Sequence, residues 1–94
     1  MYYVKKKLEI SAAHNLKLSY DSPCHNQHGH NWWFIICCKS KELNQDGMVL
    51  DFKHIKQMVH DKLDHKYINE VLDFNPTAEN MARWVVDTVP NCYK

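Results

Sequence analysis

The sequence of 94 residues has neither a strong excess of one charge nor a long basic stripe. Twelve lysines and arginines against 11 aspartates and glutamates give a formal net charge of +1 at pH 7. The only cationic run, Lys5 to Lys7, alternates between the two faces of a strand and makes no single patch. Because electrostatic attraction to phosphates needs clustered basic charge, we expect no nucleic-acid partner.

The chain also lacks an apolar stretch near the roughly 20 residues of a membrane span. Its first residues, MYYVKKK, do not have the order of charge, apolar run and cleavage site that defines a signal peptide. It contains no internal repeat, low-complexity segment or flexible linker. These absences predict no membrane association, a cytoplasmic location and one domain, residues 1–94, with a single modest core.

Only four cysteines are present, and in a reducing compartment all four are expected to be thiols. Cys37 and Cys38 are neighbours on a predicted strand, so they point to opposite faces and are interpreted as small buried hydrophobic side chains. Cys92 has no partner near it in the sequence, and we assign it no role. Cys24 differs from the other three in its sequence neighbours, because histidines follow it closely.

Two segments have the pattern of β-strands. Between residues 2 and 13 apolar and polar side chains alternate, which predicts a half-buried strand whose apolar stretch, Val4 to Ala12, ends beside His14. Residues 15–27 are rich in turn-forming residues and are predicted to be a loop. From His28 to Lys39 apolar residues occupy both the odd- and the even-numbered positions, as expected of a strand covered on both faces. Helices can cover one face, so we expect neighbouring subunits to cover the other.

Two helices are predicted to follow these strands. A turn at residues 44–47 leads to Asp51, a good N-cap for a helix over residues 52–63. Asn75-Pro76-Thr77 opens a second helix, which Pro90 ends. This order predicts an α+β fold in which an antiparallel sheet carries two helices on one face. Two strands alone are a minimal support for two helices, so the sheet is incomplete.

The segment His28-Gly29-His30 has the spacing of a metal site on a strand. Residues two apart share one face of a strand but lie on opposite sides of a helix. Their Cβ atoms would be about 6.5 Å apart, which lets both imidazoles reach one ion. Gly29 leaves room for a close approach, and His14 is the best candidate for a third ligand. Three protein ligands with one open position are typical of catalytic zinc, although iron, cobalt or nickel would also fit such a site. Taken alone, the three histidines could equally be ordinary strand histidines that bind no metal.

Five motifs in order resemble the family of 6-pyruvoyltetrahydropterin and 6-carboxytetrahydropterin synthases. This resemblance covers residues 8 to 90 and implies a tunnelling fold, in which trimers close four-stranded sheets into a barrel and commonly pair as hexamers. The motifs are Ala12-Ala13-His14, Cys24 before His28-Gly29-His30, Gly47-Met48-Val49-Leu50-Asp51-Phe52, Leu63-Asp64-His65 and Asn75-Pro76-Thr77-Ala78-Glu79-Asn80.

Within this family the spacing of the cysteine motif points to the carboxytetrahydropterin branch of queuosine biosynthesis. Three residues separate Cys24 from His28, whereas animal pyruvoyl synthases have a longer insertion there. Relatives that cleave the side chain toward folate have glutamate where this chain has Cys24 or His25. Relatives also continue into two further strands, one with a glutamate that anchors the pterin. We therefore expect that this chain, which stops at Lys94, is C-terminally truncated.

The resemblance also implies roles for single residues. The substrate would be 7,8-dihydroneopterin triphosphate, converted to 6-carboxy-5,6,7,8-tetrahydropterin with release of acetaldehyde and triphosphate. Zn²⁺ would be held by three histidines, Cys24 would be the general base, and Asp64 with His65 would relay protons from an adjacent subunit. Thr77 and Glu79 would contact the pterin. The metal ligands would be His14, His28 and His30.

Each assignment has a simpler alternative. Thr77 could be a plain N-cap and Glu79 an ordinary acidic residue of a first helical turn. Cys24 alone could be an inert loop thiol, and Asp64-His65 a polar helix end. The remaining histidines, His25, His54 and His60, are interpreted as surface residues, and Trp32, Trp33 and Phe34 as sheet core or subunit contact. Two alternative functions stay open, a pyruvoyl synthase or lyase of the same fold and a non-catalytic metal- or pterin-binding module.

Overall fold

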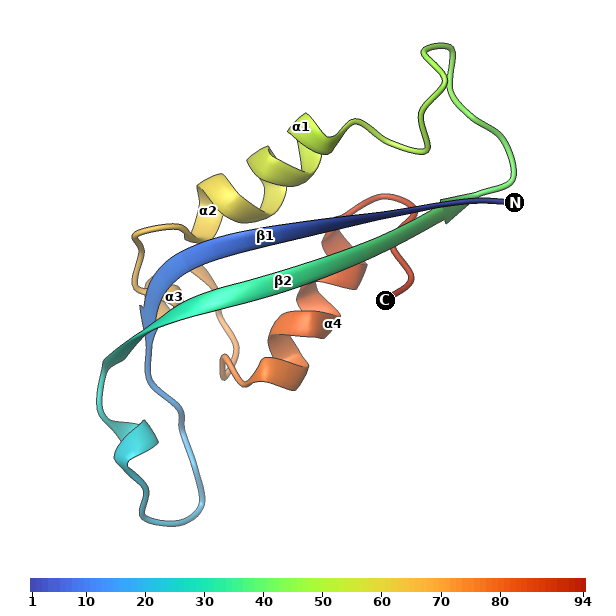
Figure 1. Ribbon diagram of the computed structural model, residues 1–94. Coiled ribbons are helices and arrows are strands. Elements are labelled where there is room, and N and C mark those ends of the chain that lie inside the picture. Colours follow the sequence, from blue (N-terminus) through green and yellow to red (C-terminus); the bar gives the residue numbers. More distant parts are fainter.

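A computed structural model describes residues 1–94 and contains one long antiparallel pair of strands. Strand β1 (Tyr2–His14) pairs with β2 (His28–Ser40) along its whole length, from Tyr2 opposite Ser40 to His14 opposite His28. Both strands curve strongly near the loop that joins them (Figure 1). This pairing confirms the two predicted strands, each slightly longer than expected from the sequence.

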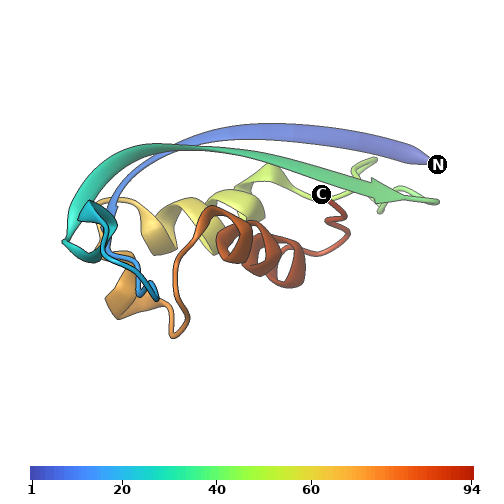
Figure 2. The ribbon, with the colours of Figure 1, turned by 90° about the horizontal axis from the view of Figure 1, so that it is seen from below.

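All helices lie on one face of the strand pair, as Figure 2 shows. This arrangement confirms the predicted α+β fold with helices on one side of the sheet. The alternation in β1 is confirmed as well, because Ile10 and Ala12 are buried while Lys7 and Glu9 are exposed. The helical elements are α1 (Phe52–Ile55), η2 (Lys56–His60), α2 (Asp61–Leu63), α3 (Ile68–Val71) and α4 (Ala78–Thr88), with a short 3-10 turn, η1 (Pro23–His25), in the loop.

The first predicted helix exists over residues 52–63, but its middle is wound as a π-helix, η2. Asp51 caps its start by accepting a hydrogen bond from the Lys53 N–H at 2.9 Å. Helix α4 ends before Pro90, as expected. The short helix α3 was not predicted, because a single turn of four residues is too short for a periodic pattern. None of the helices has the length and apolar character needed to cross a membrane.

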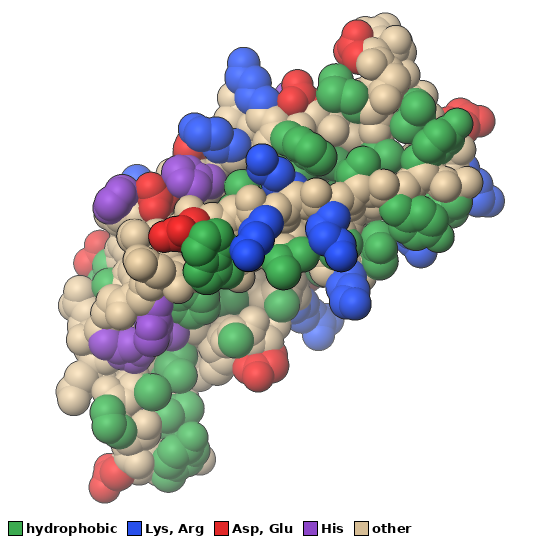
Figure 3. All heavy atoms as spheres, viewed as in Figure 1, with side chains coloured by type: hydrophobic (Ala, Val, Ile, Leu, Met, Phe, Trp, Pro, Cys, Tyr) green, Lys and Arg blue, Asp and Glu red, His purple; other side chains and the backbone are tan.

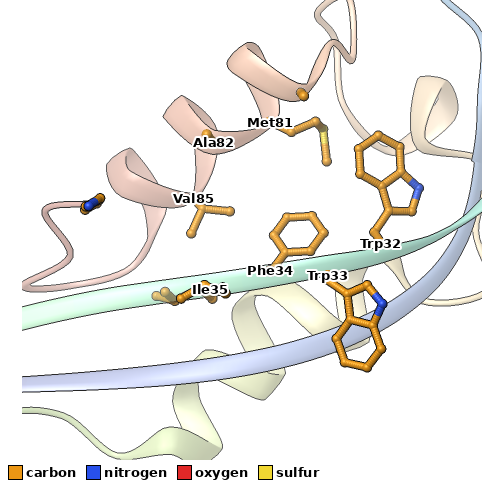
Figure 4. A pocket seen from close by; sticks show the side chains of 10 residues that line it. Trp32, Trp33, Phe34, Ile35, Met81, Ala82 and Val85 are labelled. Carbon is orange, nitrogen blue, oxygen red and sulfur yellow. The ribbon is translucent and has the colours of Figure 1, made fainter.

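The two faces of β2 differ in how far the rest of the chain covers them. In Figure 4, Trp32 and Phe34 point toward α4, whereas Trp33 points away from it. On the far face Trp33 and Ile35 are 59% and 55% exposed. The Lys7 ammonium lies 4.6 Å from the centre of the Trp33 ring, and Figure 3 shows lysine and apolar side chains mixed along the strands. The apolar side chains on this face therefore have no cover within the chain.

Cys92, to which the sequence assigned no role, lies opposite another cysteine in the fold. An antiparallel bridge joins Cys92 to Cys38, and the Tyr93 N–H donates to the Cys37 carbonyl at 3.0 Å. Cys38 is fully buried, and Cys92 packs against the same core. Sequence reasoning missed this contact because the two residues are far apart in the chain.

The buried Cys38 thiol predicts a loss of stability in alkaline solution. Burial, reinforced by neighbouring Cys92, raises its pKa from 9.0 to about 11. Above pH 9 the unfolded thiol ionises while the folded thiol keeps its proton. The stability that the buried, protonated Cys38 thiol contributes is therefore complete below pH 9 and is lost as the pH rises to about 11. We expect the free energy of unfolding to fall by about 2 kcal/mol over this interval, measured by urea unfolding with tryptophan fluorescence.

The matched control for this series is the Cys38→Ala variant. Lysine and tyrosine titrations occur in both proteins, so only the difference between the two curves reports on the thiol. Parallel curves for the two proteins from pH 8 to 11 would show that Cys38 does not resist ionisation in the folded state.

Candidate metal centre

Three histidines meet where β1 ends and β2 begins. His14 and His28 are direct partners in the strand pair, and His30 is two residues further along β2, on the same face. Their potential ligand atoms all lie within 4.8 Å of one another. The ring centres are 4.5 Å apart for His14 and His28 and 4.6 Å apart for His28 and His30. The strand register thus brings together the three predicted metal ligands.

The hydrogen bond of His14 determines which of its nitrogens is free. Nδ1 lies 3.0 Å from the Pro76 carbonyl oxygen, and because a carbonyl only accepts, Nδ1 must carry the proton. Nε2 then keeps its lone pair, yet it is buried without a hydrogen-bond partner. Burial lowers the pKa of His14 despite the opposing effect of this hydrogen bond, and the neighbouring charges of His28 and His30 lower it further. His14 therefore presents a neutral, unpaired nitrogen, as a metal ligand must.

His28 is oriented in the same way. Its Nδ1 lies 2.8 Å from the carbonyl oxygen of Asn26, which leaves Nε2 as the nitrogen with a lone pair. Histidine ligands usually donate their second ring N–H to a carbonyl or carboxylate, which fixes the ring. Three imidazoles with an orphaned buried nitrogen fit a divalent transition metal such as zinc. The backbone carbonyls of Pro76 and Asn26 could not be recognised from the sequence, because any residue has a carbonyl.

A cavity of about 590 Å³ connects these histidines with most of the other predicted site residues. Cys24, half-buried in η1, lines it together with Thr77 and Glu79 from the start of α4. The Thr77 hydroxyl accepts a hydrogen bond from the Asn80 N–H at 3.1 Å, so Thr77 does serve as the N-cap of this helix. Apolar side chains, including Leu16 and Leu18, form part of the wall. The cavity has the size and mixed lining of a small-molecule site.

Asp64 and His65 do not line this cavity. His65 borders a second cavity, of about 680 Å³, together with Ser11, Gly29 and His30 from the strands. Asp64 accepts a hydrogen bond from the Ser11 N–H at 2.9 Å, and its second oxygen is 3.5 Å from His65 Nε2. Histidine side chains accordingly gather at two separate places in Figure 3, at the strand ends and beside α2. Of the histidine cluster only His30 borders this second cavity, and neither Asp64 nor His65 lines the cavity that contains Cys24.

Of the three histidines interpreted as surface residues, His25 and His54 are exposed. His60 is only partly exposed, and its Nε2 lies 3.6 Å from Asp64. Asp64 therefore has a histidine on each side, His60 and His65. The sequence offered the signal for this arrangement, since positions 60 and 64 are one helical turn apart.

Asparagine side chains anchor the segment that follows His14. Asn69 accepts from the Asn15 N–H at 2.9 Å and donates to the Asn15 carbonyl at 3.0 Å. Asn75 makes the same pair of bonds to Lys17, at 2.8 and 2.9 Å. Each side-chain amide thus makes the two backbone hydrogen bonds that a neighbouring strand would make to that residue. Sequence reasoning missed this anchoring, because Asn15 and Asn69 are 54 positions apart.

We expect the Asn69→Ala variant to bind zinc about 10-fold more weakly than the unmodified chain, because supports behind a metal ligand typically contribute 10–100-fold to affinity. The substitution leaves both backbone groups of Asn15 without partners, so the orientation of adjacent His14 relaxes. Competition with a chromophoric chelator at neutral pH measures the affinity. Gln57→Ala, which removes an exposed amide from η2, an element that holds none of the three histidines, is the matched control. Equal zinc affinities of the Asn69→Ala and Gln57→Ala variants would contradict this assignment.

The fold and the histidine cluster define an α+β protein with a three-histidine site able to hold a metal ion. The chain belongs to the 6-pyruvoyl tetrahydropterin synthase family, whose model matches residues 3–94. Its fold is shared with the structure of the Caenorhabditis elegans 6-pyruvoyl tetrahydropterin synthase, with a TM-score of 0.67 and 25% identity over 92% of this chain and 74% of that one.

Curated bacterial relatives are similar over most of this chain. The 6-carboxy-5,6,7,8-tetrahydropterin synthase of Bacillus subtilis is 30% identical over 94% of the chain, which spans 65% of that relative. The protein of the same name from Synechocystis is 32% identical over 90% of the chain and 72% of the relative. The chain thus spans about two thirds of the length of these two proteins.

Proposed function

We propose that this protein is a zinc-dependent 6-carboxy-5,6,7,8-tetrahydropterin synthase of queuosine biosynthesis. It would convert 7,8-dihydroneopterin triphosphate to 6-carboxytetrahydropterin, with release of acetaldehyde and triphosphate. The observation that carries the proposal is the shared cavity, in which the histidine cluster, the half-buried Cys24 and the start of α4 face one space. The names of the bacterial relatives support the choice of this reaction within the family.

In this proposal the metal is held by His14, His28 and His30. Bound zinc would supply Lewis acidity, polarising the side-chain hydroxyls of the substrate. The hydrogen bonds from the imidazoles of His14 and His28 to the carbonyls of Pro76 and Asn26 hold the two rings in place and, in the neutral imidazole, leave Nε2 as the nitrogen with the lone pair. The chain therefore pre-organises its ligand set before any ion binds.

Cys24 is the proposed general base. It lines the histidine cavity and is half-buried, and the N–H of its own backbone donates to the Ser22 hydroxyl at 3.2 Å, which holds the short turn η1 in place. A thiolate is favoured close to positive charge and can take a proton from the side chain of the substrate. A fixed turn positions the sulfur better than an extended loop would.

The wall formed by the start of α4 is the proposed pterin contact. Glu79 is exposed to the cavity, so its carboxylate can accept paired hydrogen bonds from the amino and N–H groups of the ring. The Thr77 hydroxyl already accepts from Asn80, which leaves its own hydrogen free to donate. Both side chains belong to the start of the helix, Thr77 as its N-cap and Glu79 in its first turn.

Asp64 and His65 would complete the site of an adjacent subunit, as a proton relay. The pair does not line the Cys24 cavity of its own chain, and His65 is 82% exposed. The exposed Trp33 and Ile35 support a homo-oligomer, trimer or hexamer, because apolar side chains on a bare sheet face favour association. Sedimentation equilibrium tests this part of the proposal, and a monomer at micromolar concentration would contradict it.

Incubation with 7,8-dihydroneopterin triphosphate and zinc tests the activity. We expect acetaldehyde to be released in step with a product of the mass of 6-carboxytetrahydropterin. A chelator-treated sample should lose this activity and regain it with added zinc. A protein that binds zinc but forms no product would be a non-catalytic module instead.

The second candidate is a 6-pyruvoyl tetrahydropterin synthase. It is favoured by the structural likeness to the Caenorhabditis elegans protein of that name. Both reactions would use the same three histidines and Cys24. Product mass separates them, because a pyruvoyl synthase removes triphosphate and keeps the three-carbon side chain, so no acetaldehyde appears.

A further inference from the structure

Two thiols outside the metal cavity lie opposite each other. Cys38 is fully buried on the helix side of β2, and Cys92 is partly buried against the same core. An antiparallel bridge pairs the two residues. The proposed reaction uses neither of them.

The hydrogen bonds around this bridge define its type. The Tyr93 N–H donates to the Cys37 carbonyl at 3.0 Å, and the Lys39 N–H donates to the Asn91 carbonyl at 2.9 Å. These bonds flank the two cysteines instead of joining them, which makes the cysteines a non-hydrogen-bonded pair. Cα atoms in such pairs are about 4.5 Å apart and their side chains point to the same face. Disulfides bridge Cα separations of about 4.4–6.8 Å, so the backbone needs little movement.

We propose that Cys38 and Cys92 are an oxidative modification site, at which a peroxide drives formation of a reversible disulfide. The Cys92 sulfur, the more accessible of the two, attacks the peroxide. An S–O bond forms, the O–O bond breaks and one water leaves, giving a sulfenic acid. The Cys38 sulfur then attacks the Cys92 sulfur, so that the S–S bond forms and the hydroxyl leaves with the thiol proton as a second water. The two thiols lose two electrons, and the peroxide is reduced to two waters.

The other thiols are placed so that they do not compete. Cys37 is on the opposite face of β2 from Cys38 because successive strand residues alternate. Its backbone is engaged by Tyr93 and Lys94. Cys24 lies in η1 at the metal cavity. Cys38 and Cys92 are therefore the only two thiols that lie opposite each other with their side chains on the same face.

The disulfide would fasten residues 91–94 to the edge of β2. Lys94 borders an apolar cavity of about 180 Å³ between β2 and α4, in which Met81 and Val85 face Phe34 (Figure 4). In the reduced protein this segment is held by backbone hydrogen bonds to Cys37 and Lys39 and by the bond from the Asn91 side chain to the Val49 carbonyl. Oxidation adds a covalent link inside the core, while reduction by a dithiol restores the two thiols and leaves the segment held by these hydrogen bonds alone.

The test exposes the metal-loaded full chain to a small excess of hydrogen peroxide and compares it with the Cys92→Ser and Cys37→Ser variants. For the unmodified chain and Cys37→Ser we expect a mass loss of about 2 Da and a Cys38–Cys92 peptide in a non-reducing digest. The midpoint of thermal unfolding should rise by about 10 °C and fall back with dithiothreitol. Cys92→Ser should show neither the peptide nor the reversible rise.

Two outcomes would overturn the proposal. One is a peroxide-treated chain in which Cys92 gains oxygen while no Cys38–Cys92 peptide forms. The other is a reversible rise in the unfolding midpoint that is equally large in Cys92→Ser. Cys92 is partly exposed, so its substitution should leave the protein folded, and circular dichroism of the variant verifies this.

Discussion

Zinc affinity is expected to fall by about 100-fold or more in the His30→Ala variant, while the fold is kept. His30 is exposed, so its removal leaves no cavity in the core. Structural zinc sites bind with roughly 10–16 kcal/mol, and the loss of one of three protein ligands should remove about 3 kcal/mol or more. Metal content after gel filtration and chelator competition measure the effect. Product formation should disappear with the metal.

The matched control is His54→Ala, which removes an exposed histidine from α1, on a different element from the cluster. It should retain one zinc per chain with unchanged affinity. One zinc per His30→Ala chain, bound as tightly as in His54→Ala, would refute the three-histidine site. The same comparison for His14 is less informative, because His14 is buried and its substitution also disturbs packing.

Turnover is expected to fall by about 10²–10⁴-fold in Cys24→Ala, the usual contribution of general acid–base catalysis. Zinc content should stay unchanged, because Cys24 lines the cavity without belonging to the histidine cluster. The Michaelis constant should change little, since a base acts mainly in the transition state. Steady-state acetaldehyde release together with metal analysis separates these effects.

Cys92→Ala is the matched control for this experiment, because Cys92 is a thiol of similar partial burial outside the cavity. It should retain the turnover of the unmodified chain. Near-normal turnover in Cys24→Ala would remove Cys24 from the mechanism, and another residue of the cavity would then have to be the base.

Local patterns were sufficient for the main elements of the fold. The alternation in β1 predicted its buried face, and Asp51 predicted the start of the first helix, because both signals depend on near neighbours in the sequence. The spacing of His28 and His30 likewise predicted that they share a face, since a strand has a period of two. The third ligand was a weaker inference from the sequence, because His14 meets them only through the strand register.

The strand register and the packing of the helices decided the rest. The free nitrogen of His14 follows from its bond to Pro76, the segment after it is anchored by Asn69 and Asn75, and Cys38 faces Cys92. These contacts join residues that are far apart in the chain, and they use backbone groups that every residue has. Neither the hydrophobic periodicity nor a sequence motif indicates such a contact. The sequence by itself therefore determined which residues could form a metal centre, and the tertiary structure decided the orientation of the His14 and His28 rings, their supports and the placement of Asp64 and His65 outside the Cys24 cavity.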